Sequence, residues 1–239
     1  MIVKPIKTTI FIENGNLLSF VEKNIKKLPE KSILVVTSKI VALAEGSTVK
    51  TYTKKEKLEI IKQESDAYIK TKLTSLTLKD GMLMAASGVD ESNANGKLIL
   101  LPKDSFQTAD FLYRSLKKKY RLKKFGILIT DSRTFPLRQG VTGIALGFAG
   151  FNGIRDYRGL SDIFGRKFIF STTNIADCLA TSAVLVMGEG NEKQPLALIE
   201  NAPIEFTNKK MKKDSISITI EDDLYKPLLQ SLIKRIKKR

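Results

Sequence analysis

The strongest constraint on the fold is a pair of short apolar runs that each lead into polar residues. Ser32–Thr37 (SILVVT) and Phe125–Thr130 (FGILIT) consist mainly of aliphatic and β-branched residues. Runs of this length and composition are typical of strands buried on both faces. The first leads directly into SKIVALAEG, which predicts a helix over Ser38–Gly46, and the second ends at Asp131. The sequence therefore predicts a buried sheet with polar side chains at the ends of its strands.

The rest of the chain predicts strands and helices in an irregular order. Helices are predicted over Leu17–Lys27, Lys54–Lys70, Ser105–Tyr120, from Thr173 or Asn174 to Val186, and over Leu224–Lys238, and strands over Val3–Ile12, Met82–Ser87, Lys167–Ser171, Pro195–Ile199 and Ser215–Ile220. This order does not fit a regular parallel βαβ array, so we expect an α+β fold with mixed sheets. We expect one domain over 1–239, with two intertwined subdomains. Val141–Gly150 is dense in small residues, which permits close backbone approach for packing or for a ligand.

The composition limits the chemistry that the chain can perform. It has no histidine and one cysteine, Cys178, so histidine-based acid–base chemistry and thiolate metal sites are excluded. Carboxylates, amides, hydroxyls, lysine and arginine remain, and such a set suits Mg²⁺ or Mn²⁺ bound through oxygen. A lone cysteine, with neither a secretory leader nor a run of about 20 apolar residues, predicts a cytoplasmic protein without a membrane span.

The chain is strongly basic, with 41 lysines and arginines against 25 acids and a net charge of +16. Such a surface attracts anions, including nucleotides and nucleic acids. The excess lies in Lys117–Lys124, Lys209–Lys213 and Lys234–Arg239, where solvated lysines are the ordinary interpretation. Aromatic residues are not interleaved with these clusters, so nucleic-acid binding is the less favoured alternative.

Three acidic loops follow buried elements and together predict a metal site. Asp90 lies in the polar turn GVDESNANG and Asp131 in the segment TDS. Each aspartate alone is more often a turn or capping residue. A third loop, Met187–Gln194 (MGEGNEKQ), follows a small-residue helix and adds Glu189 and Glu192. Oxygen ligands from rigid strand ends, completed by phosphates and waters, suit a magnesium ion.

Any nucleotide must be bound without the common phosphate-binding motifs. The sequence contains neither a GxxxxGK[ST] segment nor a GxGxxG segment after a strand. Ser38 is a candidate, because a strand-to-helix turn directs N–H groups and a hydroxyl toward phosphate oxygens, and Lys39 adds a charge.

Several short segments together resemble one enzyme family. They are VVTSKIV with AEG (Val35–Gly46), SGVDESN (Ser87–Asn93), ITDSR (Ile129–Arg133), then GFAG, DYRG and FGRKF, and finally the stretch Thr172–Ile199. In this order and spacing they resemble the coenzyme F-420-0:γ-glutamyl ligase family, over nearly all of the chain except the last forty or so residues. The resemblance implies an α+β homodimer that uses GTP, with Mg²⁺ or Mn²⁺ and often K⁺, to add L-glutamate to the carboxylate of a deazaflavin precursor.

The resemblance also implies roles for individual residues. Asp90 and Asp131 match ligands of a first metal ion, and Ser132 and Glu189 match positions that hold a second. Ser38 and Asn93 match guanine-nucleotide contacts. The loop expected to wrap the nucleotide contributes Met187, Gly188, Gly190, Asn191, Glu192 and Gln194. The N-terminal stretch Thr9–Ile12 aligns, with a poorer match, to another nucleotide-contacting segment.

Two departures from the family pattern bear on nucleotide and metal preference. Leu43 stands where the family commonly has a nucleotide-contacting lysine, and Glu189 stands where it often has glutamine. Loss of a charge-assisted contact is typically worth about 1.5–3 kcal/mol, which leaves GTP or another triphosphate open. Lys39 is a candidate to compensate.

The implied reaction is phosphoryl transfer to the acceptor carboxylate, followed by attack of the glutamate amine on the acyl phosphate. Such chemistry depends on positioning and charge stabilisation, which arginines and metal ions supply without histidine. Arg158 and Arg138 are the candidate catalytic residues, because guanidinium groups suit carboxylate substrates. The alternative is that arginines of these segments pair with nearby aspartates.

Three other functions remain open on the sequence alone. The same chemistry on folate is the nearest alternative, because the acceptor pocket is the least recognisable part of the chain. The other two are a nucleic-acid-binding protein and a catalytically inactive relative that retains nucleotide binding. Retention of both Asp90 and Asp131 argues against the inactive relative.

Overall fold

The computed structural model describes residues 1–50 and 52–234. At its centre is a five-stranded sheet in the order β1-β12-β2-β8-β9. Its strands are β1 (Ile2–Ile6), β12 (Leu196–Glu200), β2 (Ser32–Thr37), β8 (Phe125–Thr134) and β9 (Val141–Ala149). Only β2 and β8 run parallel, and the other neighbours are antiparallel. The sheet is therefore mixed, and the α+β prediction is confirmed.

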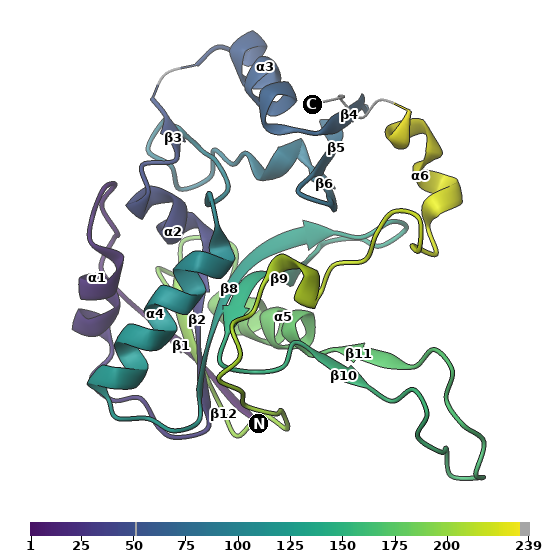
Figure 1. The fold of residues 1–239 in the computed structure, drawn as a ribbon. Coiled ribbons are helices and arrows are strands. Elements are labelled where there is room, and N and C mark those ends of the chain that lie inside the picture. The colour runs from purple at the N-terminus through teal and green to yellow at the C-terminus, as the bar shows by residue number, and fades with distance from the viewer. Residues whose placement is uncertain (51, 235–239) are drawn as a thin grey trace.

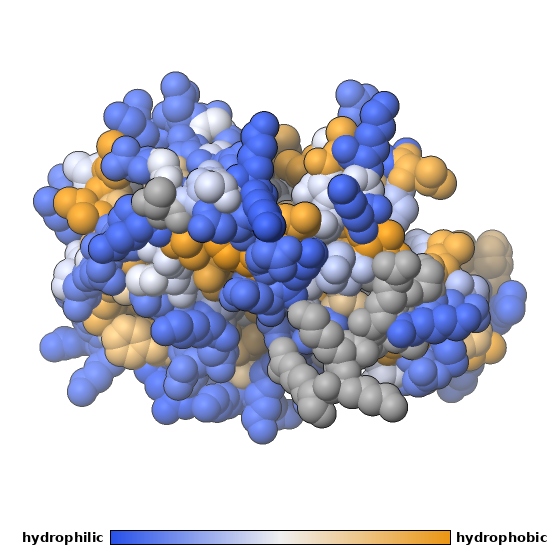
Figure 2. Space-filling model, turned by 90° about the horizontal axis from the view of Figure 1, so that it is seen from above, coloured by the Kyte–Doolittle hydropathy of each residue, from blue (hydrophilic) through white to orange (hydrophobic). Residues whose placement is uncertain are grey.

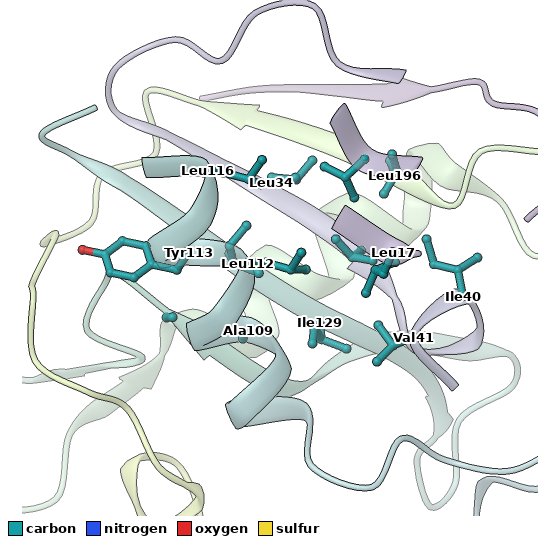
Figure 3. Packing of buried hydrophobic residues seen from close by; sticks show 14 of the residues in the cluster. Leu17, Leu34, Ile40, Val41, Ala109, Leu112, Tyr113, Leu116, Ile129 and Leu196 are labelled. Atoms are coloured by element: carbon teal, nitrogen blue, oxygen red, sulfur yellow. The ribbon is translucent and has the colours of Figure 1, made fainter. Parts of the chain in front are cut away.

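Helices cover both faces of this sheet (Figure 1). Helices α1 (Leu17–Asn24), α2 (Ser38–Ala44) and α4 (Ser105–Lys119) lie on one face, and α5 (Ile175–Met187) lies on the other. Leu112 and Leu116 of α4 point toward Leu34 of β2, and all three side chains are fully buried (Figure 3). The two faces form two apolar clusters, and their burial is the main stabilising contribution.

A second, smaller sheet lies above the first, at the end where β2 and β8 terminate (Figure 1). It contains β4 (Ala67–Lys70), β5 (Ser75–Lys79) and β6 (Met82–Ala85), all antiparallel. The preceding α3 (Lys54–Glu64) starts with a capping box between Thr53 and Glu56. A short 3₁₀ turn, η1 (Ala86–Gly88), follows β6, and the two-residue strands β3 (Thr48–Val49) and β7 (Leu98–Ile99) pair beside it.

The C-terminal segment returns to this smaller sheet. After η2 (Lys213–Ser215) it reaches α6 (Lys226–Ile233), which contacts β4. Ile220 and Leu229 pack against the small apolar cluster formed by Ala67 and Leu78. Residues 235–238 of the predicted C-terminal helix lie outside the described residues.

A narrow arm projects from the body of the molecule (Figure 1). Its base is the antiparallel pair β10 (Ile154–Asp156) and β11 (Thr172–Asn174), and residues 157–171 form the projecting loop. The arm carries exposed apolar side chains, which are Leu160, Ile163, Phe164, Ile169 and Phe170.

The face seen from above is mainly hydrophilic, as expected from the basic composition, with smaller hydrophobic patches between the charged side chains (Figure 2). None of the described helices combines the length and the apolar character needed to span a bilayer.

Several predicted elements differ from the structure. The strand predicted over Val3–Ile12 is limited to β1, which ends at Ile6, because residues 7–12 pair with no described strand. The helix predicted over Lys54–Lys70 ends at Glu64, because the chain becomes extended at Ser65 and then forms β4. Lys167–Ser171 lies in the arm loop and precedes the short β11, since only Thr172–Asn174 has a partner strand. The strand predicted over Ser215–Ile220 is also wrong, because this segment packs as turns and forms no strand ladder.

Candidate functional site

The parallel pairing of β2 and β8 brings two predicted site residues together. Thr37 lies opposite Thr130, where β2 ends while β8 continues to Thr134, so the residue that follows β2 lies beside Asp131 within β8. Ser38 begins α2 directly after β2, and its buried hydroxyl donates a hydrogen bond to the Asp131 carboxylate. The abrupt change from strand to helix in the sequence thus places a hydroxyl against a carboxylate.

Asp90 is held by the residues that surround it in its polar turn. Its backbone forms a bridge with Ile99, and its carboxylate accepts hydrogen bonds from the backbone N–H of Ser92 at 2.7 Å and from the Ser92 hydroxyl at 3.0 Å. Lys39 Nζ lies 2.7 Å from Asp90 Oδ2 and also donates to the Ser92 carbonyl at 2.8 Å. Burial raises the pKa of Asp90, but Lys39 and Ser92 outweigh it, so this pKa is lowered and the carboxylate is charged at neutral pH.

Whereas the pKa of Asp90 is lowered, the pKa of Asp131 is raised. Burial raises its pKa to about 6, and the negative charges of Asp90 and Glu189 add to the increase. Hydrogen bonds from the backbone N–H of Ser132 and from the Ser38 hydroxyl only partly oppose these effects. Three carboxylates therefore lie near one another with Lys39 as a cation that pairs with one of them.

The loop after α5 closes the other side of the cluster. Ser132 Oγ donates to Glu189 Oε2 at 3.2 Å, and Asn93 Nδ2 donates to the Gly190 carbonyl at 2.9 Å. The Gly190 N–H in turn donates to Glu192 Oε2 at 2.8 Å. Residues from three separate parts of the chain thus meet within hydrogen-bonding distance.

Gly188 allows the loop to turn back at the end of α5. It caps the helix with φ of +80° and ψ of 170°, a conformation that side chains rarely adopt. A Cβ at this position would lie 2.4 Å from the Glu192 carboxyl group. Any larger residue would therefore disturb the Glu192–Gly190 contact.

Other predicted site residues lie at or beyond the edge of the cluster. The Met187 side chain is buried in the apolar cluster under α5, so only its backbone faces the loop. Asn191 is exposed and Gln194 is partly buried in the same loop. Next to this loop, the Thr8 N–H donates to the Lys193 carbonyl at 2.9 Å, which places the segment Thr9–Ile12 close to it.

The two candidate catalytic arginines do not join the cluster. Arg158 lies on the arm and pairs with Asp156, its Nε being 2.9 Å from Asp156 Oδ1. This contact lowers the pKa of Asp156 to about 2. Arg138 lies exposed in the turn between β8 and β9. Among the described residues, neither arginine contacts Asp90 or Asp131. Their catalytic roles therefore stay predictions.

Leu43, at the position where the resemblance implies a lysine, packs into the protein. Its partly buried side chain contacts the main apolar cluster and the group formed by Ala42, Ala94 and Ile99. The nearby Lys39 is directed to Asp90 and Ser92 instead.

The oxygen donors of the cluster fit a hard divalent cation. In the part of the chain that the structure describes, no group of three or more histidine, cysteine, aspartate or glutamate residues has the geometry of a complete metal cage. Mg²⁺ typically takes one or two carboxylates and completes its shell with substrate phosphates and water. The raised pKa of Asp131, which is due mainly to burial and to which the negative charges of Asp90 and Glu189 add, favours a cation here.

A cavity of about 790 Å³ lies beside the end of β8 and the start of α5, and the sequence did not reveal it. It is lined by Arg133, two residues beyond Asp131 on β8, and by Asn174 and Asp177 at the start of α5. Burial lowers the pKa of Arg133, while the negative charge of Asp177 opposes the decrease. Arg133 lies within the segment ITDSR, but no sequence pattern indicated that its side chain borders a cavity.

Comparisons with known proteins identify the class of enzyme first. A protein of Methanococcus maripaludis named coenzyme F420:L-glutamate ligase is 34% identical over 199 residues, which cover 76% of this chain and 80% of the relative. Ligases of the same name from Methanocaldococcus jannaschii (32% identity, 83% of this chain and 80% of the relative) and Methanopyrus kandleri (29%, 85% and 88%) are also similar. The fold and the relatives define an enzyme that joins an acid to an amino acid.

The family follows from the match of a family model. The model described as F420-0:Gamma-glutamyl ligase matches residues 5–201. The chain therefore belongs to the F420-0:gamma-glutamyl ligase family, as its sequence motifs predicted.

Proposed function

We propose that the chain is a GTP-dependent and divalent-metal-dependent ligase that joins L-glutamate to the carboxylate of the deazaflavin F420-0. The observation that carries the proposal is the meeting of Asp90, Asp131, Ser132 and Glu189 at one edge of the main sheet, beside the glycine-rich loop after α5. The names of the relatives support the acceptor and the amino acid. Nothing among these relatives favours folate as the acceptor.

The proposed reaction has two steps. A carboxylate oxygen of the acceptor attacks the γ-phosphorus of GTP, which forms an acyl phosphate and releases GDP. The amine of glutamate then attacks the acyl carbon, a C–N bond forms, phosphate leaves with the former acyl oxygen, and the amine gives up its proton to water. Both steps concentrate negative charge on phosphate oxygens, so charge stabilisation is the main task of the enzyme.

The residues of the cluster have distinct tasks in this proposal. Asp90 and Asp131 would hold one Mg²⁺ or Mn²⁺, and Ser132 and Glu189 would hold a second cation, for which K⁺ is also a candidate. A bound divalent cation neutralises charge on the phosphates. Asn93 holds the loop by binding the Gly190 carbonyl, and Ser38 orients the Asp131 carboxylate by donating to it. Lys39 would exchange part of its contact with Asp90 for a phosphate oxygen.

We further propose that the enzyme works as a homodimer in the cytoplasm. The exposed apolar side chains of the arm favour association, because contiguous apolar surface typically marks an interaction site. The single cysteine is compatible with a reducing compartment.

Phosphate release tests the proposed activity. Purified protein with GTP, Mn²⁺ and L-glutamate should release phosphate only when F420-0 is added, and reduced folate should not replace it. Asp90→Asn and Asp131→Asn should each lower the rate by a factor of about 100 or more, because each removes an anionic ligand. Arg114→Gln, on the exposed surface of α4, is the control and should retain the rate. Equal rates for wild type and both aspartate variants would contradict the proposed site.

A further inference from the structure

The large cavity approaches the cluster of carboxylates along β8, although Asp90, Asp131 and Glu189 are not among its lining residues. Asp131 and Arg133 are two positions apart on β8 and therefore point to the same face of the sheet. Successive strand residues rise by about 3.3 Å, so their Cα atoms are roughly 7 Å apart. A molecule whose body lies in the cavity against Arg133 would therefore have to extend one end by about this distance along β8 to reach Asp131.

The cavity walls are mainly apolar. On the sheet side they include Leu101, Phe106, Ile144 and Leu146, which come from the β7–α4 connection, α4 and β9. A volume of about 790 Å³ is typical of a site for a cofactor-sized ligand, and such sites combine apolar walls with a few polar anchors. The walls therefore suit a largely aromatic or aliphatic body.

Arg133 is one of several cationic residues that line the cavity, with Lys103, Lys210, Lys212 and Lys213, and it is the one that lies on β8. Its partly buried guanidinium group lies 5.1 Å from the centre of the Phe135 ring, which orients it along the wall. Among the described residues no carboxylate lies within 4.0 Å of it. Asp177 is the acid whose negative charge affects the pKa of Arg133. Its carboxylate already accepts hydrogen bonds from the Ala145 N–H and from Asn174 Nδ2, both at 2.8 Å. A guanidinium group in this state retains donors for an external anion.

The opposite wall comes from the C-terminal segment. Met211, Ile216, Ile218 and Leu228 line the cavity, and all of them lie beyond residue 201, where the match to the family model ends. This wall is thus supplied by a part of the chain outside the shared family region. The shape of this wall therefore depends on residues that follow the region matched by the family model.

We infer that this cavity binds the acceptor, with Arg133 holding an anionic group of the acceptor, the C-terminal segment covering its ring system, and its reacting carboxylate directed toward Asp131. The inference rests on the proposed function and adds the acceptor site to it. It makes Arg133 a binding residue and makes Ile218 a determinant of acceptor size.

Calorimetric titration of F420-0 into the full-length protein tests the inference. Arg133→Gln should weaken acceptor binding roughly ten- to a hundred-fold, since a charge-assisted hydrogen bond is lost. Ile218→Trp should also weaken it, because the side chain is 59% exposed and a larger residue fills the cavity without disturbing the core. Binding of GTP with Mn²⁺ should stay within about two-fold of wild type in both variants, as it should in the control Arg114→Gln.

The outcomes separate this inference from the proposed function. Wild-type turnover together with unchanged acceptor binding in both Arg133→Gln and Ile218→Trp would overturn the cavity as the acceptor site. Absence of any glutamylated product from the wild-type protein would overturn the proposed function itself. Selective loss of acceptor binding with intact GTP binding is the result that the inference predicts.

Discussion

Asp131 shows how burial and neighbouring charges change the behaviour of one residue. Its pKa of about 6 lies above the usual 3.8 because burial and the charges of Asp90 and Glu189 disfavour its ionised form. A raised pKa means that the folded state binds the proton more tightly than the unfolded state. The contribution to stability is complete below pH 4 and is lost as pH rises through about 6.

This pH dependence is testable in the metal-free protein. Between about pH 4 and pH 7 the free energy of unfolding of wild type should fall, relative to Asp131→Asn, by up to about 3 kcal/mol. Urea denaturation of both proteins at several pH values measures the difference. If the difference in the free energy of unfolding between the two proteins did not change with pH, the pKa of Asp131 would not be raised in the folded state.

Gly188 is a residue whose backbone conformation supports the loop. Gly188→Ala should lower the free energy of unfolding by about 1–3 kcal/mol, because φ is +80°. It should also weaken GTP binding, because the new Cβ displaces Glu192 from the Gly190 N–H. Chemical denaturation and nucleotide titration measure the two effects.

Gly159→Ala is the matched control for this variant. Gly159 has φ of +81°, and an added Cβ there meets no atom within 4 Å. It should lose a similar amount of stability but bind GTP normally. Equal GTP binding in both variants would contradict the role of the loop.

At the residue scale the sequence predicted the acids of the cluster but not their partners. Asp90 and Asp131 were recognisable as carboxylates that follow apolar strands. The contact of Lys39 with Ser92 joins residues 53 positions apart, so no local pattern could show it. Arg133 was missed for the same reason, since its importance depends on a cavity built from distant segments.

The central helix α4 shows how one element holds the core together. Leu112 is fully buried against the main sheet (Figure 3). The adjacent Phe111 is 54% exposed. Leu112→Ala should lower the free energy of unfolding by about 2–5 kcal/mol through lost burial and a residual cavity. Phe111→Ala should change it by less than about 1 kcal/mol. Similar midpoints for the two variants in urea denaturation would contradict this packing.

At the element scale, buried elements with clear hydrophobic patterns were predicted better than short or exposed ones. Strand β2 and the amphipathic α4 were predicted close to their observed bounds, because their patterns are unambiguous. Strand β8 continues past the predicted end at Thr130 as far as Thr134 and so includes Asp131. In the small sheet β6 was predicted as a strand over Met82–Ser87, whereas β4 and β5 were missed. Ala67–Lys70 is short and continues a charged helical pattern. The segment Ser215–Ile220 has strand-like residues, but Ile216 packs against the apolar cluster under α5 and Ile220 against the small sheet, so no partner strand is available to the segment.

At the scale of the whole molecule, the arm makes association testable. Phe164 and Phe170 are 89% and 87% exposed, so they would be buried only by another molecule. The wild-type protein should sediment as a dimer, and the double variant Phe164→Asp, Phe170→Asp should sediment as a folded monomer. Leu73→Asp is the control, because Leu73 is 94% exposed in the turn between β4 and β5, and it should remain a dimer. A wild-type monomer in sedimentation velocity, or a dimeric arm variant, would contradict the arm as the dimer contact.

The overall architecture was predictable as a class but not as a topology. The irregular element order indicated α+β, whereas the strand order β1-β12-β2-β8-β9 depends on long-range pairing. The pairing matters for function, because the parallel alignment of β2 with β8 brings Ser38 beside Asp131.

The most direct test of the proposed ligase is the mass of the acceptor after incubation with the protein, GTP, Mn²⁺ and L-glutamate. The account predicts that F420-0 gains the mass of one glutamyl residue per addition, that wild type and Arg114→Gln do this equally, and that Asp131→Asn does not. An unchanged acceptor mass with wild-type protein that binds GTP and Mn²⁺ would contradict the proposed function.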